Sequence, residues 1–300
     1  MENEILKCMD LHKSIGKKEI IKGISFDIKE GEILGFIGSN GAGKTTTIKL
    51  IIGLQNFLRG HITINGYDIK KDFEKAIEKV GTIVENPDLY MYMSGYDNLK
   101  LVANLYKGIN KSRIDEVVKL VGLENRIKDK VSKYSLGMRQ RLGIAGAILH
   151  KPNLLILDEP TNGLDPEGIK QVRDLIAKLA KEEKMAVMIS SHNLSEIENV
   201  CNKICIIKNG EIVEQSKLDD IKKEVSKGEY IIEVDSPKNA KELLECEVKD
   251  TTISIQAEKE EIPEIIKKLV ENNIKIYSVT ENILSLEEAF LKKTGGNVIE

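Results

Sequence analysis

The sequence lacks any apolar run long enough to cross a bilayer. A spanning helix needs about 20 consecutive apolar residues, whereas apolar runs such as Leu154–Leu157 and Ala186–Ile189 have the length of strands. The chain also lacks the start of a secretory signal, which is basic and then apolar, because it begins Met-Glu-Asn-Glu. We therefore expect a protein without membrane spans of its own, located in the cytoplasm.

No basic stretch stands out either. The 45 Lys and Arg residues are intermixed with 48 Asp and Glu residues, which leaves a net charge of −3. Proteins that bind nucleic acid usually carry a basic patch or stripe. We therefore expect no nucleic-acid partner, and the small net charge gives no reason to expect direct binding to anionic lipid.

Cysteine is scarce, with four residues in 300. Cys201 and Cys205 are four positions apart and follow His192, which raises the question of a metal site. A zinc site needs a second Cys/His pair at defined spacing, and the sequence has none. The pattern favours small buried residues in a reduced compartment.

Short apolar segments alternate with helical patterns over residues 1–215. We expect strands at Ile5–Leu11, Ile24–Ile28, Ile33–Ile37, His61–Ile64, Val80–Val84, Leu154–Leu157 and Ala186–Ser190. We expect helices at Thr46–Leu54, Ser94–Leu105, Ile114–Val121 and Leu136–Leu149, and after Asp165-Pro166. This alternation predicts an α/β fold with a mostly parallel sheet covered on both faces.

The character of the sequence changes after about Gln215, where a polar, lysine-rich segment begins. Beyond it we expect strands at Tyr230–Val234, Ile253–Ile255 and Ile274–Val279, and helices at Ala240–Leu244, Ile262–Val270 and Leu286–Leu291. The second of these helices places five apolar residues, Ile262, Ile265, Ile266, Leu269 and Val270, on one face. We therefore divide the chain into a large domain, residues 1–215, and a small α+β domain, residues 216–300.

A glycine-rich loop lies between the first expected α/β strand and its helix. Its residues match the pattern G-x-x-x-x-G-K-[ST] in full: Gly38, Ser39, Asn40, Gly41, Ala42, Gly43, Lys44 and Thr45. Glycines let the backbone amides surround phosphate oxygens, and the following helix adds the positive end of its dipole. We expect Lys44 to reach the β- and γ-phosphates, Thr45 to bind Mg²⁺ and Thr46 to extend the nucleotide site. The loop alone indicates an NTPase or a kinase.

Two acids, Asp158 and Glu159, end the apolar strand Leu154–Leu157. Neighbouring strand residues point to opposite faces, and the chain turns at Pro160, so the two carboxylates can serve different purposes. Asp158 is placed to hold Mg²⁺. Glu159 is then free to polarise the attacking water as a general base.

Three further segments resemble the ATP-binding subunits of ABC transporters. Residues 134–141 are similar to the signature segment of that family; Ser135 and Gly137 match it, whereas Tyr134, Leu136 and Met138 depart from it. Gly163-Leu164-Asp165 resembles the D-loop, and Ser191-His192 resembles the switch histidine. The resemblance covers residues 1 to about 215, and the order of its motifs is very specific.

The resemblance implies a P-loop NTPase of ABC type, with a mostly parallel core sheet, an antiparallel β subdomain and a helical subdomain. It further implies that ATP binds between two copies arranged head to tail, with Ser135 and Gly137 of one copy closing on the γ-phosphate held by the other. His192 is expected to contact that γ-phosphate. Such subunits drive separate membrane permeases and attach peripherally to the cytoplasmic face of the membrane through them.

Two positions depart from the family. Where members usually carry glutamine, this chain has Glu85, and a carboxylate there would bind Mg²⁺ or water more strongly than an amide. The aromatic residue that usually stacks on adenine aligns with Ile15, which predicts a weaker contact with the base. Glu85, together with a tail at residues 284–296, resembles the branch that exports bacitracin-like and lantibiotic peptides or drugs.

The resulting hypothesis is an ABC exporter ATPase whose cargo is a peptide antibiotic or a drug. The alternative is an ABC ATPase that acts on DNA or ribosomes, which usually has tandem ATPase halves or a long coiled-coil insertion. Each motif occurs once here, which disfavours this alternative. A non-enzymatic regulator is disfavoured because Lys44, Asp158, Glu159 and His192 are all present.

Overall fold

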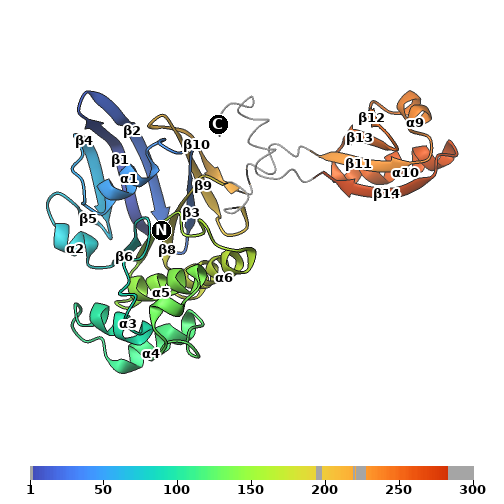
Figure 1. Cartoon of the computed structure of the whole chain (residues 1–300). Helices are drawn as coiled ribbons and strands as arrows, with labels where there is room; N and C mark the ends of the chain where they lie inside the picture. Colours follow the sequence, from blue (N-terminus) through green and yellow to red (C-terminus); the bar gives the residue numbers. More distant parts are fainter. Residues whose placement is uncertain (1–2, 194–197, 219, 221–227, 283–300) are drawn as a thin grey trace. The chain divides into compact units, whose positions relative to one another are not determined.

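The computed structural model describes residues 3–193, 198–218, 220 and 228–282, which divide into two compact units (Figure 1). Among the described residues, the first unit ends at Lys217 and the second begins at Leu218. The expected helix Leu286–Leu291 and the exporter-like tail lie outside the described residues. No described helix is both long enough and apolar enough to cross a bilayer.

The first unit is built on a six-stranded sheet. Its strands, in the order β10-β9-β3-β8-β7-β6, are β10 (Glu211–Lys217), β9 (Lys203–Lys208), β3 (Ile33–Ile37), β8 (Ala186–Ser191), β7 (Leu154–Asp158) and β6 (Val80–Ile83). All neighbours are parallel except β10, which runs antiparallel to β9. Every residue of β3, β7 and β8 is buried, as expected for apolar strands covered on both faces.

An antiparallel sheet lies beside it, in the order β2-β1-β4-β5. Its strands are β1 (Glu4–Ile15), β2 (Lys18–Lys29), β4 (Arg59–Ile64) and β5 (Tyr67–Asp68). The last two are joined by Asn65 and Gly66, both with positive φ, which is the hairpin turn that this dipeptide favours. Apolar side chains of the two sheets form one core, so the antiparallel sheet is fixed against the first β/α unit.

Among the described residues, the first unit has the helices α1 (Lys44–Ile51), α2 (Phe73–Ile77), α3 (Gly95–Ala103), α4 (Lys111–Leu120), η1 (Val131–Lys133), α5 (Leu136–Ile148) and α6 (Pro166–Glu182). Ser94, Asn110, Ser135 and Asp165 cap four of them through side-chain oxygens that accept backbone amides. These caps fix where the helices begin. Figure 1 shows α3 and α4 gathered beside α5 as a separate helical group.

The hairpin of β9 and β10 was not among the expected strands. β9 begins at Lys203, which is largely buried, and continues with the apolar run Ile204–Ile207. Nζ of Lys203 lies 2.9 Å from Oδ2 of Asp27 and donates to the Asp27 carbonyl. An opposite charge on a distant strand thus compensates for the buried lysine, and this compensation cannot be read from the local sequence.

The second unit has the order βαββαβ. It contains β11 (Glu229–Val234), α9 (Pro237–Leu243), β12 (Glu247–Lys249), β13 (Thr252–Gln256), η2 (Lys259–Glu261), α10 (Ile262–Glu271) and β14 (Ile276–Glu281). The sheet is antiparallel, in the order β12-β13-β11-β14, which is the split βαβ arrangement. The expected α+β fold of this part is confirmed.

One detail of the expected helix in this unit is wrong. Ile262 and Leu269 are buried in its core, and Ile265 and Ile266 pack against that core. Val270, which belongs to the same predicted face, is 58% exposed. It lies in the last turn of α10, two residues before the C-cap Asn272, so the apolar face ends one residue earlier than the periodicity predicts.

Candidate active site

The glycine-rich loop joins β3 to α1. Lys44 is buried, and its Nζ donates to the carbonyl oxygens of Gly38 (2.6 Å) and Ser39 (3.3 Å). Gly43 has φ 115°, and a Cβ there would lie 2.7 Å from Cδ1 of Ile21, so a side chain would not fit. No side chain caps α1, which leaves the first amides of this helix able to bind an anion.

Asp158 connects the loop to the neighbouring strand. The hydroxyl of Thr45 donates to Oδ2 of Asp158 (2.9 Å), and the hydroxyl of Ser190 donates to Oδ1 (2.5 Å). Asp158 is 1% exposed, so its carboxylate is held in one position by two hydroxyls. A hydroxyl and a carboxylate are hard oxygen donors of the kind that Mg²⁺ prefers. The residues present therefore fit the expected metal.

Ser190 was not predicted as a site residue. Its oxygen donates to Asp158 and also accepts the backbone amide of Glu159 (2.9 Å). Ser190 reaches both acids because β8 lies beside β7 with Asp158 opposite Ser190. The only sequence signal was the pair of serines before His192 at the end of a strand, and its meaning depends on which strands are neighbours.

Glu159 lies directly after Asp158, the last residue of β7. Its Oε2 lies 2.8 Å from Nδ1 of His192, and its Oε1 lies 3.3 Å from Nζ of Lys44. The backbone of Glu159 has φ 49°, a conformation that non-glycine residues adopt rarely and that clusters at functional sites. The two acids thus have different partners. Asp158 bonds to the Thr45 and Ser190 hydroxyls, whereas Glu159 contacts a histidine and a lysine.

A cleft of about 240 Å³ opens over these groups. Its lining residues are Asn40, Gly41, Gly43, Lys44, Thr45, Thr46, Glu159, Asn162 and His192. Asn162 is the one lining residue that the sequence analysis did not single out. The cleft therefore joins the phosphate loop, a carboxylate and a histidine, which are the groups needed to bind a nucleotide and to activate water beside its terminal phosphate.

Ser135 and Gly137 occupy the start of α5. The Ser135 hydroxyl accepts the Met138 amide at 3.2 Å, so Ser135 is the N-cap of this helix. Among the described residues that line the cleft, neither Ser135 nor Gly137 occurs. The described signature residues therefore do not form part of the wall of this cleft.

Glu85 and Ile15 also lie outside the lining of this cleft, as far as the described residues define it. Glu85 has φ 66°, and its Oε1 lies 3.2 Å from Nζ of Lys49 on α1. Ile15 is exposed at the end of β1, where the chain turns at Gly16 into β2. Glu85 is thus paired with α1, the helix that follows the phosphate loop. Its partner Lys49 lies three residues after Thr46, the last residue of this helix that lines the cleft.

These features define an NTPase-like site with a P-loop, a buried aspartate and a Glu–His pair. The family model described as ABC transporter matches residues 21–162. The chain is 46% identical to the ABC transporter ATP-binding protein YhcH of Bacillus subtilis, over 97% of this chain and 96% of that protein. The chain belongs to the ABC transporter ATP-binding proteins.

Two relatives have transport functions in their names. The bacitracin transport ATP-binding protein BcrA of Bacillus licheniformis is 41% identical over 98% of this chain and 99% of its own length. The lantibiotic transport ATP-binding protein SrtF of Streptococcus pyogenes is 42% identical over 72% of this chain and 92% of its own length. The predicted resemblance to the bacitracin and lantibiotic branch is confirmed, and neither name supports the alternative of action on DNA or ribosomes.

A solved structure has the same fold as the ATPase part. It is the dimeric structure of a post-hydrolysis state of the ATP-binding cassette MJ0796, bound to ADP and Pi. It matches with a TM-score of 0.63 and 25% identity, over 71% of this chain and 98% of that one. The predicted ABC-type fold and the predicted ATPase activity are confirmed: the chain is an ATP-binding subunit that hydrolyses ATP.

Proposed function

We propose that this chain is the ATPase of an exporter that removes a peptide antibiotic, with residues 1–215 as the nucleotide-binding domain and residues 216–300 as an accessory domain. The observation that carries the hydrolytic part is the convergence of Lys44, Glu159 and His192 on one cleft. The names of BcrA and SrtF support the choice of cargo. A drug remains the second class of cargo, as the sequence resemblance implied.

In the proposed reaction, the amides of Gly41 to Thr46 and the ammonium of Lys44 bind the phosphates. Thr45 and Asp158 would hold Mg²⁺, with Glu85 as a further candidate ligand, and a bound metal would neutralise charge that develops on the phosphates. Glu159 accepts a proton from water as the general base. His192 orients the Glu159 carboxylate and contacts the γ-phosphate.

The proposed working unit contains two copies. Ser135 and Gly137 lie at the start of α5, where backbone amides and the helix dipole favour an anion, and they do not line the cleft of their own copy in the described structure. A second copy in head-to-tail arrangement would bring them to the γ-phosphate. ATP then holds the two copies together, and hydrolysis breaks this link by cleaving off the γ-phosphate.

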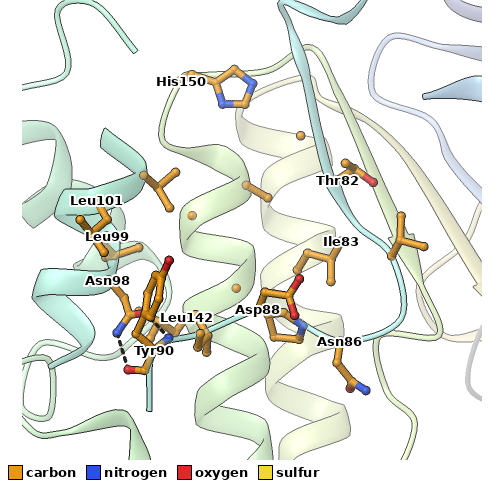
Figure 2. Close-up of a pocket in the computed structure, with 18 of the residues that line it drawn as sticks. Thr82, Ile83, Asn86, Asp88, Tyr90, Asn98, Leu99, Leu101, Leu142 and His150 are labelled. Atoms are coloured by element: carbon orange, nitrogen blue, oxygen red, sulfur yellow. Dashed lines mark hydrogen bonds between the residues drawn. The ribbon is translucent and has the colours of Figure 1, made fainter. Parts of the chain in front are cut away.

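A second pocket supports the proposed membrane partner. It has a volume of about 430 Å³ and lies between β6, the segment that follows it, α3 and α5 (Figure 2). Asn98 fixes one wall, because its Nδ2 donates to the Tyr90 carbonyl (3.1 Å) and its Oδ1 accepts the Tyr90 amide (2.8 Å). Figure 2 shows Leu99 and Leu101 close together on one side of the pocket and Leu142 nearer to Tyr90.

Exposed apolar side chains surround this pocket, including Tyr90, Tyr92 and Leu101. Such a concentration marks an interaction surface, and we assign it to a cytoplasmic helix of a multi-spanning permease. Glu85 lies between the pocket-lining residues Val84 and Asn86 and is paired with Lys49 of α1. An ion pair therefore connects the helix after the phosphate loop to the pocket. In this proposal the permease holds the protein at the cytoplasmic face of the membrane.

The test uses the chain co-expressed with a multi-spanning membrane protein as candidate permease, in a host sensitive to a bacitracin-like peptide. We expect resistance with the wild type and loss of resistance with Glu159→Gln. Leu101→Glu should abolish co-purification with the membrane protein while leaving ATP hydrolysis by the purified chain. Leu54→Glu, at an exposed leucine outside the pocket, is the matched control and should change neither.

Resistance that is independent of Glu159 would contradict the export function. Co-purification that survives Leu101→Glu would contradict the assigned docking surface and leave the ATPase assignment in place.

A further inference from the structure

The sheet of the second unit has two free edges among the described residues, formed by β12 and β14. They differ in their protection against pairing with another chain. β12 has three residues, and Glu247 and Lys249 flank its single apolar residue, Val248. Short length and charged side chains are the usual means by which proteins block edge pairing, so the β12 edge is protected.

The β14 edge is longer and less charged, and its pairing with β11 has one register shift, between Ser278 and Ile276. It has six residues, Ile-Tyr-Ser-Val-Thr-Glu, without proline or lysine, and its one charge is Glu281 at the end. β-Branched and aromatic residues of this kind favour strand pairing. Tyr277 is 64% exposed and Val279 is 37% exposed, so apolar side chains are available along the edge.

The backbone of β14 also has hydrogen-bonding groups directed away from the sheet. Asn282 donates its amide to the Glu229 carbonyl at 2.8 Å, and Thr280 lies opposite Ile231 in the same register. In an antiparallel ladder, residues alternate between those that bond to the neighbouring strand and those that do not. Val279 and Glu281 therefore direct their N–H and C=O groups outward.

We propose that β14 pairs antiparallel with β14 of a second copy, which gives a contact between two copies that needs no nucleotide. A two-fold axis makes the contact self-complementary. Antiparallel pairing places the two Glu281 carboxylates at opposite ends of the paired strands, so like charges do not meet across the ladder. The same strand supplies Tyr277 and Val279 on both sides, and these form aromatic and β-branched cross-strand pairs.

This contact differs from the proposed ATP-dependent dimer in the surface that it uses. One six-residue strand pair covers less than the roughly 1,000 Å² of a stable interface, so the contact is weak by itself. It gains strength when ATP already holds two copies together, because the second contact is then intramolecular. Its function is to keep two ATPase copies near each other after hydrolysis has released the nucleotide.

The test is sedimentation velocity of the full chain without nucleotide, over a concentration series. We expect a reversible dimer. Val279→Lys, which places charge on the free edge, should raise the dimer dissociation constant at least about tenfold. Val248→Lys, at a comparably exposed valine on the protected β12 edge, is the matched control and should leave the constant unchanged. Thermal unfolding of each variant checks that it is folded.

A second variant addresses the backbone groups. Val279→Pro removes an N–H that faces outward, which an edge strand tolerates, and it should weaken the dimer as Val279→Lys does. A chain that stays monomeric without nucleotide would overturn the proposal, as would equal weakening by Val248→Lys. A third outcome would also overturn the proposal: the full chain is monomeric, and a chain ending at Asn282 is dimeric. That result would mean that residues 283–300 occupy the β14 edge.

A third arm separates this contact from the proposed function. Glu159→Gln with ATP should give a dimer even when Val279→Lys is added, because ATP joins the copies through the first unit. If this double variant stayed monomeric with ATP, the ATP-dependent dimer would be contradicted. The sedimentation series without nucleotide tests the β14 contact separately.

Discussion

Nδ1 of His192 lies 2.8 Å from Oε2 of Glu159. The two residues come from the ends of β8 and β7, which are neighbours in the sheet, so strand order and not sequence proximity brings them together. The pair gives the carboxylate one orientation in the cleft above the phosphate loop. Residues that act as a unit have non-additive effects when replaced, which leads to the first prediction.

His192→Ala is expected to lower kcat about 10²-fold or more, within the range of a lost acid–base contribution. Adding Glu159→Gln should lower kcat little further, because either change already removes the pair. The measurement is steady-state ATP hydrolysis by the two single variants and the double variant. Fully multiplicative effects would show that His192 acts independently of Glu159.

Ser190 is expected to position both acids. Ser190→Ala removes the bond to Asp158 and the acceptor of the Glu159 amide, and the loss of such supporting hydrogen bonds lowers metal affinity or activity about 10- to 100-fold. Titration of hydrolysis with Mg²⁺ should show a higher half-saturating concentration. Ser191→Ala is the control, because the Ser191 hydroxyl bonds to the backbone of Asn193 and to neither acid; an equal effect would refute the specific role of Ser190.

Glu85→Gln restores the residue usual in the family. The pair with Lys49 is well exposed on the glutamate side, and such pairs contribute about 0–1 kcal/mol, so the free energy of unfolding should change little. We expect a higher Mg²⁺ requirement, because an amide binds the ion less strongly than a carboxylate. Lys49→Ala is the control for loss of the pair alone. An unchanged Mg²⁺ dependence and unchanged peptide resistance would remove Glu85 from the site.

His150 predicts a dependence of stability on pH. Burial lowers the pKa of this imidazole in the folded chain, helped by the nearby Lys79 and Arg113, although a bond to the Val80 carbonyl opposes the shift. The ring stacks on Tyr106 at 4.4 Å. Because the folded pKa lies below the ordinary value of about 6.5, the unfolded chain takes up the proton first.

The contribution of His150 to stability is therefore complete above about pH 6.5 and is lost as the pH falls through the folded pKa. Denaturant unfolding between pH 7.5 and pH 5 measures it, with His150→Gln as the comparison. We expect the variant to lose less stability than the wild type over this interval. An identical pH dependence of the two proteins would show that His150 does not titrate differently on folding.

Local patterns predicted much of the fold. The helix starts followed from capping residues such as Ser94 and Asp165, and the buried strands followed from continuous apolar runs such as Leu154–Leu157. β9 was missed although Ile204–Ile207 is an apolar run as long as Leu154–Leu157 and Asn209-Gly210 favours a hairpin. Only the burial of Lys203 could not be predicted locally, because Asp27 compensates for its charge from far away in the sequence.

The same division holds for the site. The loop residues and the two acids were predictable from motifs, because the chemistry needs those residues consecutively. Ser190 and Asn162 were not, because their place depends on the order of the strands and on the shape of the cleft. The role of Glu85 stays a prediction: the sequence suggested a metal ligand, and the structure adds the pair with Lys49.

The central claim is that Glu159 is the general base of an ATP site shared by two copies. Its most direct test is Glu159→Gln, assayed for ATP hydrolysis and for size in the presence of ATP and Mg²⁺. The account predicts hydrolysis lowered about 10²- to 10⁴-fold and a stable dimer that retains ATP. Normal hydrolysis by this variant would contradict the assignment of the base, and ATP retention by a monomer would contradict the shared site.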